Sequence, residues 1–501
     1  MIRTRVFIGT VLLILPMLIA AERQAPPDGP RIEWAPLPAP FAEPRPDART
    51  GYLIVPERRE TPRSGRTIRL PFLILKSRSA SPRPDPVFFT AGGPGGSTLS
   101  RTGFFSRSPL RDDRDIILLE QRGNRFAEPA LMGPEIDRAL RSGWGARLNG
   151  DPDPLVVKAA LSAAARSLKE SGIDPTGYTT KESAADIAEL RRLLGIEAWN
   201  LYGVSYGTKL ILTILRDHPE GVRAVILDSV LPLEANCDEE TPANILVALN
   251  SVFAVCREDE RLRERFPDLR ERFFRLLAEA NRHPIEIETT NPSEAKPLAV
   301  TLDGVGIMNC VYNGLEDSSV VPRLPLIIDA ACRGEYARLA PLAKTYLGST
   351  QGTAWGMRIS VWCNEELPFM DPKKVLRPSG LPPELARFIQ PQIPWGAQRA
   401  WPRGHPAEAE NRPVRSFVPT LIAAGEFDPD TPTKWAHQTA GHLPNARLIE
   451  FAGFSHAPLF GHPEAARIMR EFLAVPSRTP EPGKAAERPA FRISWEEPPP
   501  N

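Results

Sequence analysis

Gly203-Val204-Ser205-Tyr206-Gly207 has the form G-x-S-x-G. A mostly apolar run, Ala198–Tyr202, precedes it, and a helix-like run, Tyr206–His218, follows it. This sequence between a strand and a helix is typical of a nucleophile elbow, a strained turn that exposes a serine hydroxyl above a sheet. The glycines allow strand and helix to approach closely. The same pattern also arises in ordinary glycine turns, but the flanking strand and helix favour the elbow.

The length and charge of the chain limit the possible domain organisation and the classes of partner. The chain has 501 residues, enough for a large core and more than one domain. Its 62 lysines and arginines are balanced by 61 aspartates and glutamates. No net charge therefore favours nucleic acid or an anionic membrane surface as a partner. The 55 prolines predict many turns and loops.

The first 21 residues have the pattern of a secretory signal peptide. Arg3 and Arg5 form a basic start, Val6–Ile19 is an apolar stretch, and Ala20-Ala21 offers small residues for cleavage. A membrane anchor is the alternative, but the stretch is shorter than the ~20 residues that a spanning helix needs. We therefore expect cleavage after Ala21, or after Ala20, and a periplasmic or secreted protein without a stable membrane anchor.

Short apolar runs alternate with helix-like segments, which is the pattern of an α/β sheet. A helix is expected at Ser183–Leu194, with Ser183 as its N-cap and Asp186 three residues later. The expected strands besides the elbow strand are Tyr52–Val55, Ile68–Leu75, Val87–Thr90, Ile116–Leu119, Ala224–Asp228, Thr420–Ala424 and Ala446–Phe451.

The pattern changes in residues 233–412, where helix-like charged segments such as Arg257–Arg282 dominate. We interpret this region as a helical cap inserted into the sheet domain. The sheet domain then comprises residues 22–232 and 413–475. Residues 476–501 are rich in proline and polar side chains, so they are expected to form a disordered tail.

A serine nucleophile needs a base, and the base needs an orienting acid. Asp428 lies just after one expected strand, and His456 lies just after the next. These two residues are the candidate acid and base for Ser205. Asp228 is the rival acid, since it follows the strand after the elbow helix, whereas Glu426 is interpreted as a turn residue.

An acyl-transfer intermediate also needs preorganised backbone donors for its oxyanion. The N–H of Tyr206, directly after the nucleophile, is one expected donor. The glycine-rich loop Ala91–Ser97 follows an early strand, and Gly93 is its expected donor. A phosphate-binding loop is the alternative, but this segment lacks the G-K-[ST] ending.

Four motifs carry a resemblance: Gly92-Gly93-Pro94-Gly95-Gly96-Ser97, Glu120-Gln121-Arg122-Gly123, Trp199–Thr208 and Gly425-x-x-Asp428-x-x-Thr431-Pro432. Together they resemble the prolyl iminopeptidase and tripeptidyl aminopeptidase family of α/β-hydrolases. The resemblance implies the α/β-hydrolase fold, serine-dependent release of residues from peptide N-termini, and triad roles for Ser205, Asp428 and His456. Ala91 stands where many prolyl iminopeptidases have histidine, which favours the tripeptidyl branch. Glu120 stands where aspartate is common.

Val361–Glu366 resembles the cap segment in which relatives carry a C-x-E motif. An N-terminal exopeptidase must hold a free ammonium group, and a partly buried carboxylate binds such a group well. Glu365 is the candidate for this role and Glu366 is the second candidate. A solvated acidic pair is the alternative interpretation.

The five cysteines lie in the part expected to be exported, where disulfides are permitted. Proximity in sequence predicts the pairs Cys237–Cys256 and Cys310–Cys332, which leaves Cys363 free. The sequence contains no C-x-x-C motif, so the cysteine spacing does not indicate a zinc site.

The sequence as a whole predicts an exported serine aminopeptidase. It acts through an acyl-enzyme on peptides with a free N-terminus and requires no metal or organic cofactor. An esterase or other acyl hydrolase with the same triad is the alternative. A second alternative is a binding protein that has the same scaffold but no catalytic activity.

Overall fold

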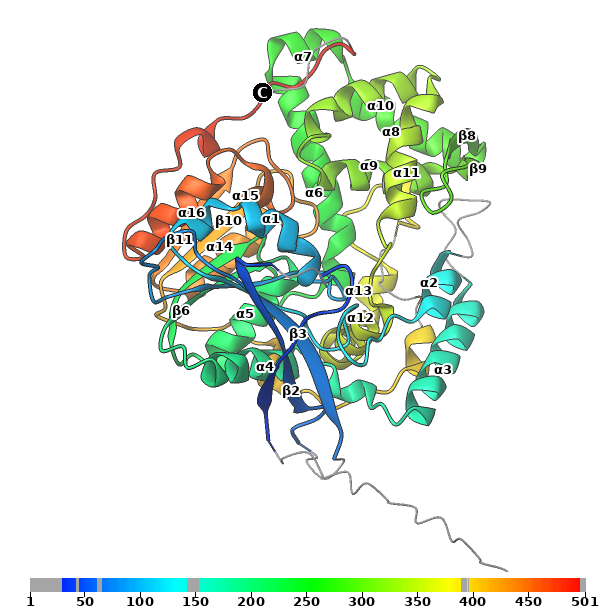
Figure 1. Ribbon diagram of the computed structural model, residues 1–501. Coiled ribbons are helices and arrows are strands. Elements are labelled where there is room, and N and C mark those ends of the chain that lie inside the picture. Colours follow the sequence, from blue (N-terminus) through cyan, green and yellow to red (C-terminus); the bar gives the residue numbers. More distant parts are fainter. Residues whose placement is uncertain are drawn as a thin grey trace, which may run out of the picture.

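The computed structural model describes residues 29–41, 45–60, 65–141, 153–388, 394 and 396–495. The expected signal peptide lies outside these residues. The main sheet has nine strands in the order β1-β2-β3-β5-β4-β6-β7-β10-β11. Strands β8 and β9 form a separate hairpin, apart from this sheet (Figure 1). The strands are β1 (Arg31–Trp34), β2 (Ala48–Pro56), β3 (Thr67–Leu75), β4 (Val87–Thr90), β5 (Ile116–Leu119), β6 (Trp199–Val204), β7 (Val222–Asp228), β8 (Ile285–Thr290), β9 (Pro297–Leu302), β10 (Thr420–Gly425) and β11 (Ala446–Phe451).

Strands β5, β4, β6, β7, β10 and β11 run parallel, whereas β1, β2 and β3 add an antiparallel edge. This arrangement confirms the mostly parallel sheet that the sequence predicts. Parallel neighbours place their carboxyl ends at one edge, which is where ligands bind in open α/β sheets. The loops after β4, β6, β7, β10 and β11 therefore meet at a common edge.

Helices cover both faces of the sheet because side chains along each buried strand alternate between two cores. In β7, Val225 and Leu227 join the core under α4 (Thr180–Leu193), α5 (Tyr206–Asp217) and α14 (Thr433–His442). Ala224 and Ile226 join the opposite core, under α1 (Thr102–Arg107), α15 (Pro458–Gly461) and α16 (Ala465–Ala474).

Between β7 and β10 the chain forms an inserted segment with its own core. Figure 1 shows it, in green and yellow, as a layer beyond the sheet. It contains the β8–β9 hairpin as well as helices, so it is not purely helical. Its helices are α6 (Cys237–Glu258), α7 (Glu260–Arg265), α8 (Leu269–Arg282), α9 (Gly304–Glu316), α10 (Leu324–Cys332), α11 (Ala340–Gly348), α12 (Trp355–Val361) and α13 (Pro372–Leu376).

Two helix boundaries differ from the sequence prediction. Helix α4 begins at Thr180 rather than after Ser183, because the hydroxyl of Thr179 accepts a hydrogen bond from the Glu182 N–H and caps the helix. The expected single helical segment Arg257–Arg282 is split between α6, α7 and α8. Pro267 disfavours a helical conformation of the residue before it, and this ends α7.

Two further helices precede the inserted segment but pack against it. They are α2 (Pro134–Arg141) and α3 (Pro154–Glu170), which the sequence assigned to the sheet domain. Ile136 and Leu161 share a buried cluster with Trp355 and Ile359 of α12. The apolar side of these helices therefore covers the inserted segment rather than the sheet.

The C-terminal segment corrects the expectation of a disordered tail for residues 476–495. Phe491 is buried against Phe427, with ring centroids 5.9 Å apart. The carbonyl of Ala485 accepts a hydrogen bond from the Ala452 N–H at 2.9 Å. The expectation of disorder rested on the many prolines of this segment. Its few aromatic residues anchor the chain nevertheless.

All five cysteines are free thiols, so the predicted disulfides Cys237–Cys256 and Cys310–Cys332 are wrong. Cys237 and Cys256 lie near opposite ends of α6. At ~1.5 Å per residue they are separated by more than the ~7 Å between Cα atoms that a disulfide spans. Among the described helices, none is long and apolar enough to cross a membrane.

The packing of α5 on the sheet gives a stability prediction. A Cβ on Gly207 would lie 2.6 Å from the carbonyl oxygen of Thr90. We expect Gly207→Ala to lower the free energy of unfolding by roughly 1–3 kcal/mol, because this oxygen belongs to a buried strand. Gly441→Ala in α14 is the control, since its Cβ would meet no atom within 4 Å. Urea denaturation measures both variants, and an unchanged midpoint for Gly207→Ala would contradict the prediction.

Candidate active site

Ser205 lies at the sharp turn between β6 and α5. Its backbone has φ 56° and ψ −128°, a conformation that residues other than glycine rarely adopt. The turn is held by hydrogen bonds, because the Ser205 N–H donates to Asp228 O at 3.0 Å and its carbonyl accepts from Thr208. The Ser205 side chain lines a large pocket. The elbow expected from the sequence is therefore present, with its strained backbone.

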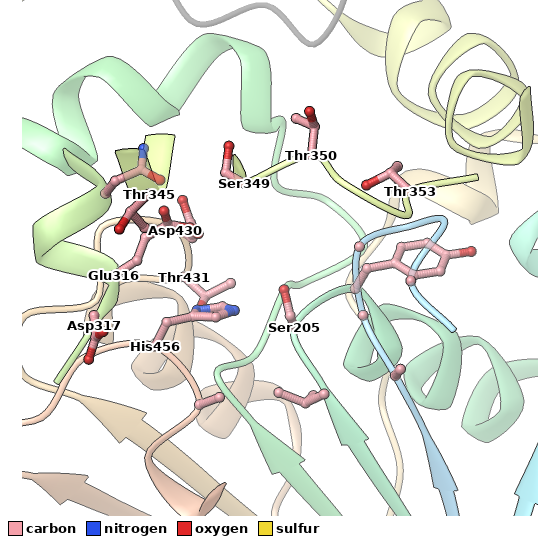
Figure 2. Close-up of a pocket in the computed structure, with 18 of the residues that line it drawn as sticks. Ser205, Glu316, Asp317, Thr345, Ser349, Thr350, Thr353, Asp430, Thr431 and His456 are labelled. Carbon is pink, nitrogen blue, oxygen red and sulfur yellow. The ribbon is translucent and has the colours of Figure 1, made fainter. Parts of the chain in front are cut away.

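His456 and Asp428 reach the same region from the ends of β11 and β10. The Nδ1 of His456 lies 2.9 Å from Oδ2 of Asp428. Figure 2 shows the His456 ring beside Ser205, with the ring edge pointing toward the serine hydroxyl. The Asp428 side chain is fully buried, whereas that of His456 is 19% exposed. The fold thus brings all three predicted residues together.

Asp428 is held by hydrogen bonds that the sequence analysis did not assign. Thr431 donates to it through both its hydroxyl (2.6 Å) and its N–H (2.9 Å). The hydroxyl of Ser229 donates to Oδ2 at 2.8 Å. Burial alone would raise the pKa of Asp428, but the charge of His456 and the hydrogen bonds to His456 and Thr431 lower it below its usual range. Thr431 was visible in the G-x-x-D-x-x-T-P motif, whereas Ser229 had no sequence signal.

The rival carboxylates make other contacts. Asp228 accepts a hydrogen bond from the Tyr202 hydroxyl at 3.1 Å. Burial raises its pKa to about 7. Glu426 accepts from the Gly453 N–H at 2.7 Å, as expected of a turn residue. The structure therefore pairs His456 with Asp428 and not with Asp228.

The glycine-rich loop lies against the nucleophile. A Cβ on Gly92 would lie 2.7 Å from the Cβ of Ser205, so only glycine allows this approach. Gly93 has φ +124°, and both residues line the pocket together with Tyr206. From α12, Nη1 of Arg358 donates to the carbonyls of Gly93 (3.1 Å) and Pro94 (3.3 Å). Arg358 is a support that the sequence did not reveal.

The Glu120–Gly123 motif holds the same loop in place by hydrogen bonds. The buried carboxylate of Glu120 accepts hydrogen bonds from the Ser97 hydroxyl at 3.0 Å and the Leu99 N–H at 3.1 Å. Gln121 donates to the carbonyl of Ala91 at 2.9 Å. Burial raises the pKa of Glu120 to about 7. The motif therefore acts through the position of the loop and does not reach the pocket itself.

Glu365 and Glu366 do not occupy the position that the sequence predicted. They end a π-helical turn, Trp362–Glu366, and neither is among the described residues that line the pocket. Glu365 accepts hydrogen bonds from Thr180, whose hydroxyl is also 2.7 Å from the Tyr206 hydroxyl. Glu366 forms a buried ion pair with Lys209 of α5. The two carboxylates thus attach the inserted segment to the elbow helix, and the anchor role is withdrawn.

The pocket between the sheet edge and the inserted segment has a volume of about 1660 Å³. Its acidic wall is formed by Glu316 from α9 and Asp430 from the loop after β10 (Figure 2). The two side chains share a hydrogen bond, and Tyr312 donates to Asp430 at 2.6 Å. Burial and the Asp430 charge raise the pKa of Glu316 well above its usual range. No metal-binding group of His, Cys, Asp and Glu occurs within the described ranges.

Comparisons with known proteins match this architecture. Residues 85–294 match a family profile described as "alpha/beta hydrolase fold", and residues 388–485 match one described as "TAP-like protein". The protein is an α/β-hydrolase. The hydrolase is 23% identical to "Serine protease Hip1" of Mycobacterium tuberculosis over 400 residues, which are 74% of each chain.

A second relative is "Proline iminopeptidase" of Xylella fastidiosa, which is 31% identical over 129 residues, or 24% of this hydrolase and 38% of that protein. Together with the TAP-like match, these relatives confirm the resemblance to the prolyl iminopeptidase and tripeptidyl aminopeptidase family. Among solved structures, a thermophilic esterase from Thermogutta terrifontis has a TM-score of 0.35 and 15% identity, covering 82% of this hydrolase and 95% of that chain.

The acidic wall gives a pH prediction for His456. Burial lowers the pKa of this histidine, but the charge and hydrogen bond of Asp428 and the charge of the Glu316–Asp430 pair outweigh burial and raise it above the usual value. A general base acts in its neutral form, so activity should rise with pH and its acidic limb should lie above ~6.5. The double variant Glu316→Gln with Asp430→Asn removes the charge of the carboxyl pair and should move the limb to lower pH.

The measurement is the pH profile of kcat/KM on p-nitrophenyl acetate, a substrate without an ammonium group. Asp112→Asn is the control, because this carboxylate lies on the surface outside the pocket. An unchanged limb in the double variant Glu316→Gln with Asp430→Asn would show that the acidic wall does not act on His456.

Proposed function

We propose that this hydrolase is an exported serine aminopeptidase that cleaves peptide bonds near the free N-terminus of its substrates. The observation that carries the proposal is the buried Asp428–His456 pair beside Ser205, in a pocket whose wall also holds a carboxyl pair. The peptidase relatives support the same reaction class.

In the proposed mechanism Ser205 attacks the scissile carbonyl carbon, and His456 takes the hydroxyl proton. Asp428 holds the imidazole in the required tautomer and stabilises its charged form. The oxyanion is bound by the N–H groups of Gly93 and Tyr206. His456 then donates its proton to the leaving amine. A water molecule, deprotonated by His456, hydrolyses the acyl-enzyme and releases Ser205.

The carboxyl pair Glu316–Asp430 supports the preference for a free N-terminus. A half-buried carboxyl pair without a cation keeps a proton, because two charges side by side repel each other. The ammonium group of a peptide can replace this proton and satisfy both oxygens by charge-assisted hydrogen bonds. These residues therefore take the role that the sequence had assigned to Glu365 and Glu366.

The proposal places the enzyme in the periplasm or outside the cell. Its support is the sequence of residues 1–21, with a basic start, an apolar stretch and small residues at the expected cleavage site. The proposed partners are peptides, which a pocket of about 1660 Å³ accommodates in extended form.

Substitution of the proposed triad tests the mechanism. We expect Ser205→Ala, His456→Ala and Asp428→Asn each to lower kcat by roughly 10⁴-fold, because the three residues act as a unit. Asp228→Asn is the matched control, since it changes a buried carboxylate that bonds to Tyr202 instead. Steady-state kinetics on a chromogenic substrate measure the effect. Full activity in Asp428→Asn with loss in Asp228→Asn would assign the acid to β7.

The free N-terminus distinguishes an aminopeptidase from an esterase or endopeptidase. A free peptide should be cleaved about 10- to 100-fold faster, as kcat/KM, than its N-acetylated form, because acetylation removes charge-assisted hydrogen bonds. The double variant Glu316→Gln with Asp430→Asn should shrink this preference. Asp317→Asn is the control, because this pocket acid already accepts hydrogen bonds from Ser319.

Equal rates on the free and acetylated peptides would reject the aminopeptidase proposal. An active enzyme that cleaves only simple esters would favour the esterase. A protein whose Ser205 is not labelled by an active-site phosphonate would favour a binding role.

A further inference from the structure

Helix α9 presents two different faces. Its apolar residues, among them Ile307, Val311 and Leu315, are buried in the core of the inserted segment. Residues separated by three or four positions, together with the neighbour of one of them, lie on the other side and line the pocket. That side consists of Val305, Asn309, Tyr312, Asn313 and Glu316. It faces the cavity above Ser205, so α9 forms one wall of the space that a substrate occupies.

Asn313 has an incomplete set of hydrogen bonds. It is 4% exposed, and its Nδ2 donates to the carbonyl of Asn309 at 3.3 Å. No described residue donates to its Oδ1, which leaves this acceptor at the pocket wall. This oxygen is not among the buried atoms that lack a partner, so it is accessible from the pocket that Asn313 lines. The pocket therefore contains an amide oxygen that a ligand can satisfy.

The position of Asn313 relative to the carboxyl pair indicates the donor. Asn313 precedes Glu316 by three residues, or about 4.5 Å along the helix axis at ~1.5 Å per residue. An extended peptide advances by about 3.3–3.6 Å per residue. A peptide whose ammonium group lies at Glu316 and Asp430 thus brings its first amide N–H close to Asn313. For this contact the peptide must run from its N-terminus at Glu316 toward Asn313, which is opposite to the direction of α9.

We propose that Asn313 binds the substrate main chain, with its Oδ1 accepting a hydrogen bond from the N–H of the substrate's second residue. The inference rests on the proposed aminopeptidase function and deepens it. It makes the polar face of α9 a subsite for the peptide group itself, whatever the side chains. A simple ester has no such N–H and gains nothing from Asn313.

A binding experiment on uncleaved ligands tests this contact. The enzyme carries Ser205→Ala, so that no ligand is hydrolysed. The two ligands are tetra-alanine and its analogue with lactate at the second position, where an ester oxygen replaces the N–H. Calorimetry compares Ser205→Ala alone with the same protein that also carries Asn313→Leu. We expect Asn313→Leu to weaken tetra-alanine binding about 5- to 10-fold and to leave the lactate analogue unchanged.

Asn313→Asp is the second variant, because it keeps an acceptor at this position. It should retain the discrimination between the two ligands, whatever its charge adds to the binding of both. Asn313→Leu should melt close to the parent protein, since it removes only the hydrogen bond from Nδ2 to the Asn309 carbonyl. A purely structural role of Asn313 would weaken both ligands equally.

The outcomes separate this inference from the proposed function. Loss of affinity for both ligands in equal measure, or for neither, would overturn the role of Asn313 while a preference for free over N-acetylated tetra-alanine stands. Equal binding of free and N-acetylated tetra-alanine would overturn the aminopeptidase proposal instead. Absence of any binding of tetra-alanine would overturn both.

Discussion

The approach of α5 to the sheet is the constraint on which the rest of the site depends. A Cβ on Gly203 would lie 2.6 Å from the carbonyl oxygen of Gly207, and a Cβ on Gly207 would meet β4. Because both positions lack a side chain, the turn between β6 and α5 closes tightly and holds Ser205 at a positive φ. The glycine-rich loop then fits against Ser205, since Gly92 also lacks a side chain.

Buried charges attach the other parts of the site to this turn. Lys209 and Glu366 join α5 to the inserted segment, and Glu365 with Thr180 joins the same segment to Tyr206. A buried ion pair of this kind is destabilising to break, because the remaining charge has no partner. The inserted segment and the elbow are therefore held in one arrangement, and Arg358 extends this coupling to the glycine-rich loop.

The carboxyl groups around the pocket have different pKa values because their surroundings differ. Asp428 has a lowered pKa because His456 and Thr431 stabilise its charge, whereas Glu316 has a raised pKa because it is buried beside Asp430. Groups whose pKa values are moved apart in this way serve different roles in many active sites. In the proposed enzyme the first orients the base, and the second receives the substrate's positive charge.

Local sequence was sufficient for the elements whose chemistry is local. The G-x-S-x-G turn, the strand positions and the acid and histidine at strand ends could be predicted, since each depends on apolar runs and on residues next to a strand. Asp428 and His456 pair because neighbouring parallel strands end at one edge of the sheet. The Thr179 cap of α4 and the Pro267 break before α8 are also local features. They were missed because Ser183 looked like the N-cap and Arg257–Arg282 looked like one continuous helical segment.

The tertiary structure alone decided which carboxylates face the substrate pocket. Glu365 resembled an anchor by motif, but a π-helical turn directs it to Thr180, while Glu316 and Asp430 meet from segments far apart in the chain. Ser229 was missed for the same reason, since it meets Asp428 across the ends of neighbouring strands, and Arg358 and Asn313 reach the site from the inserted segment. The sequence thus determined the nucleophile, its partners and the sheet through short-range patterns. The substrate-facing wall depends on long-range packing of an inserted segment, which no local pattern encodes.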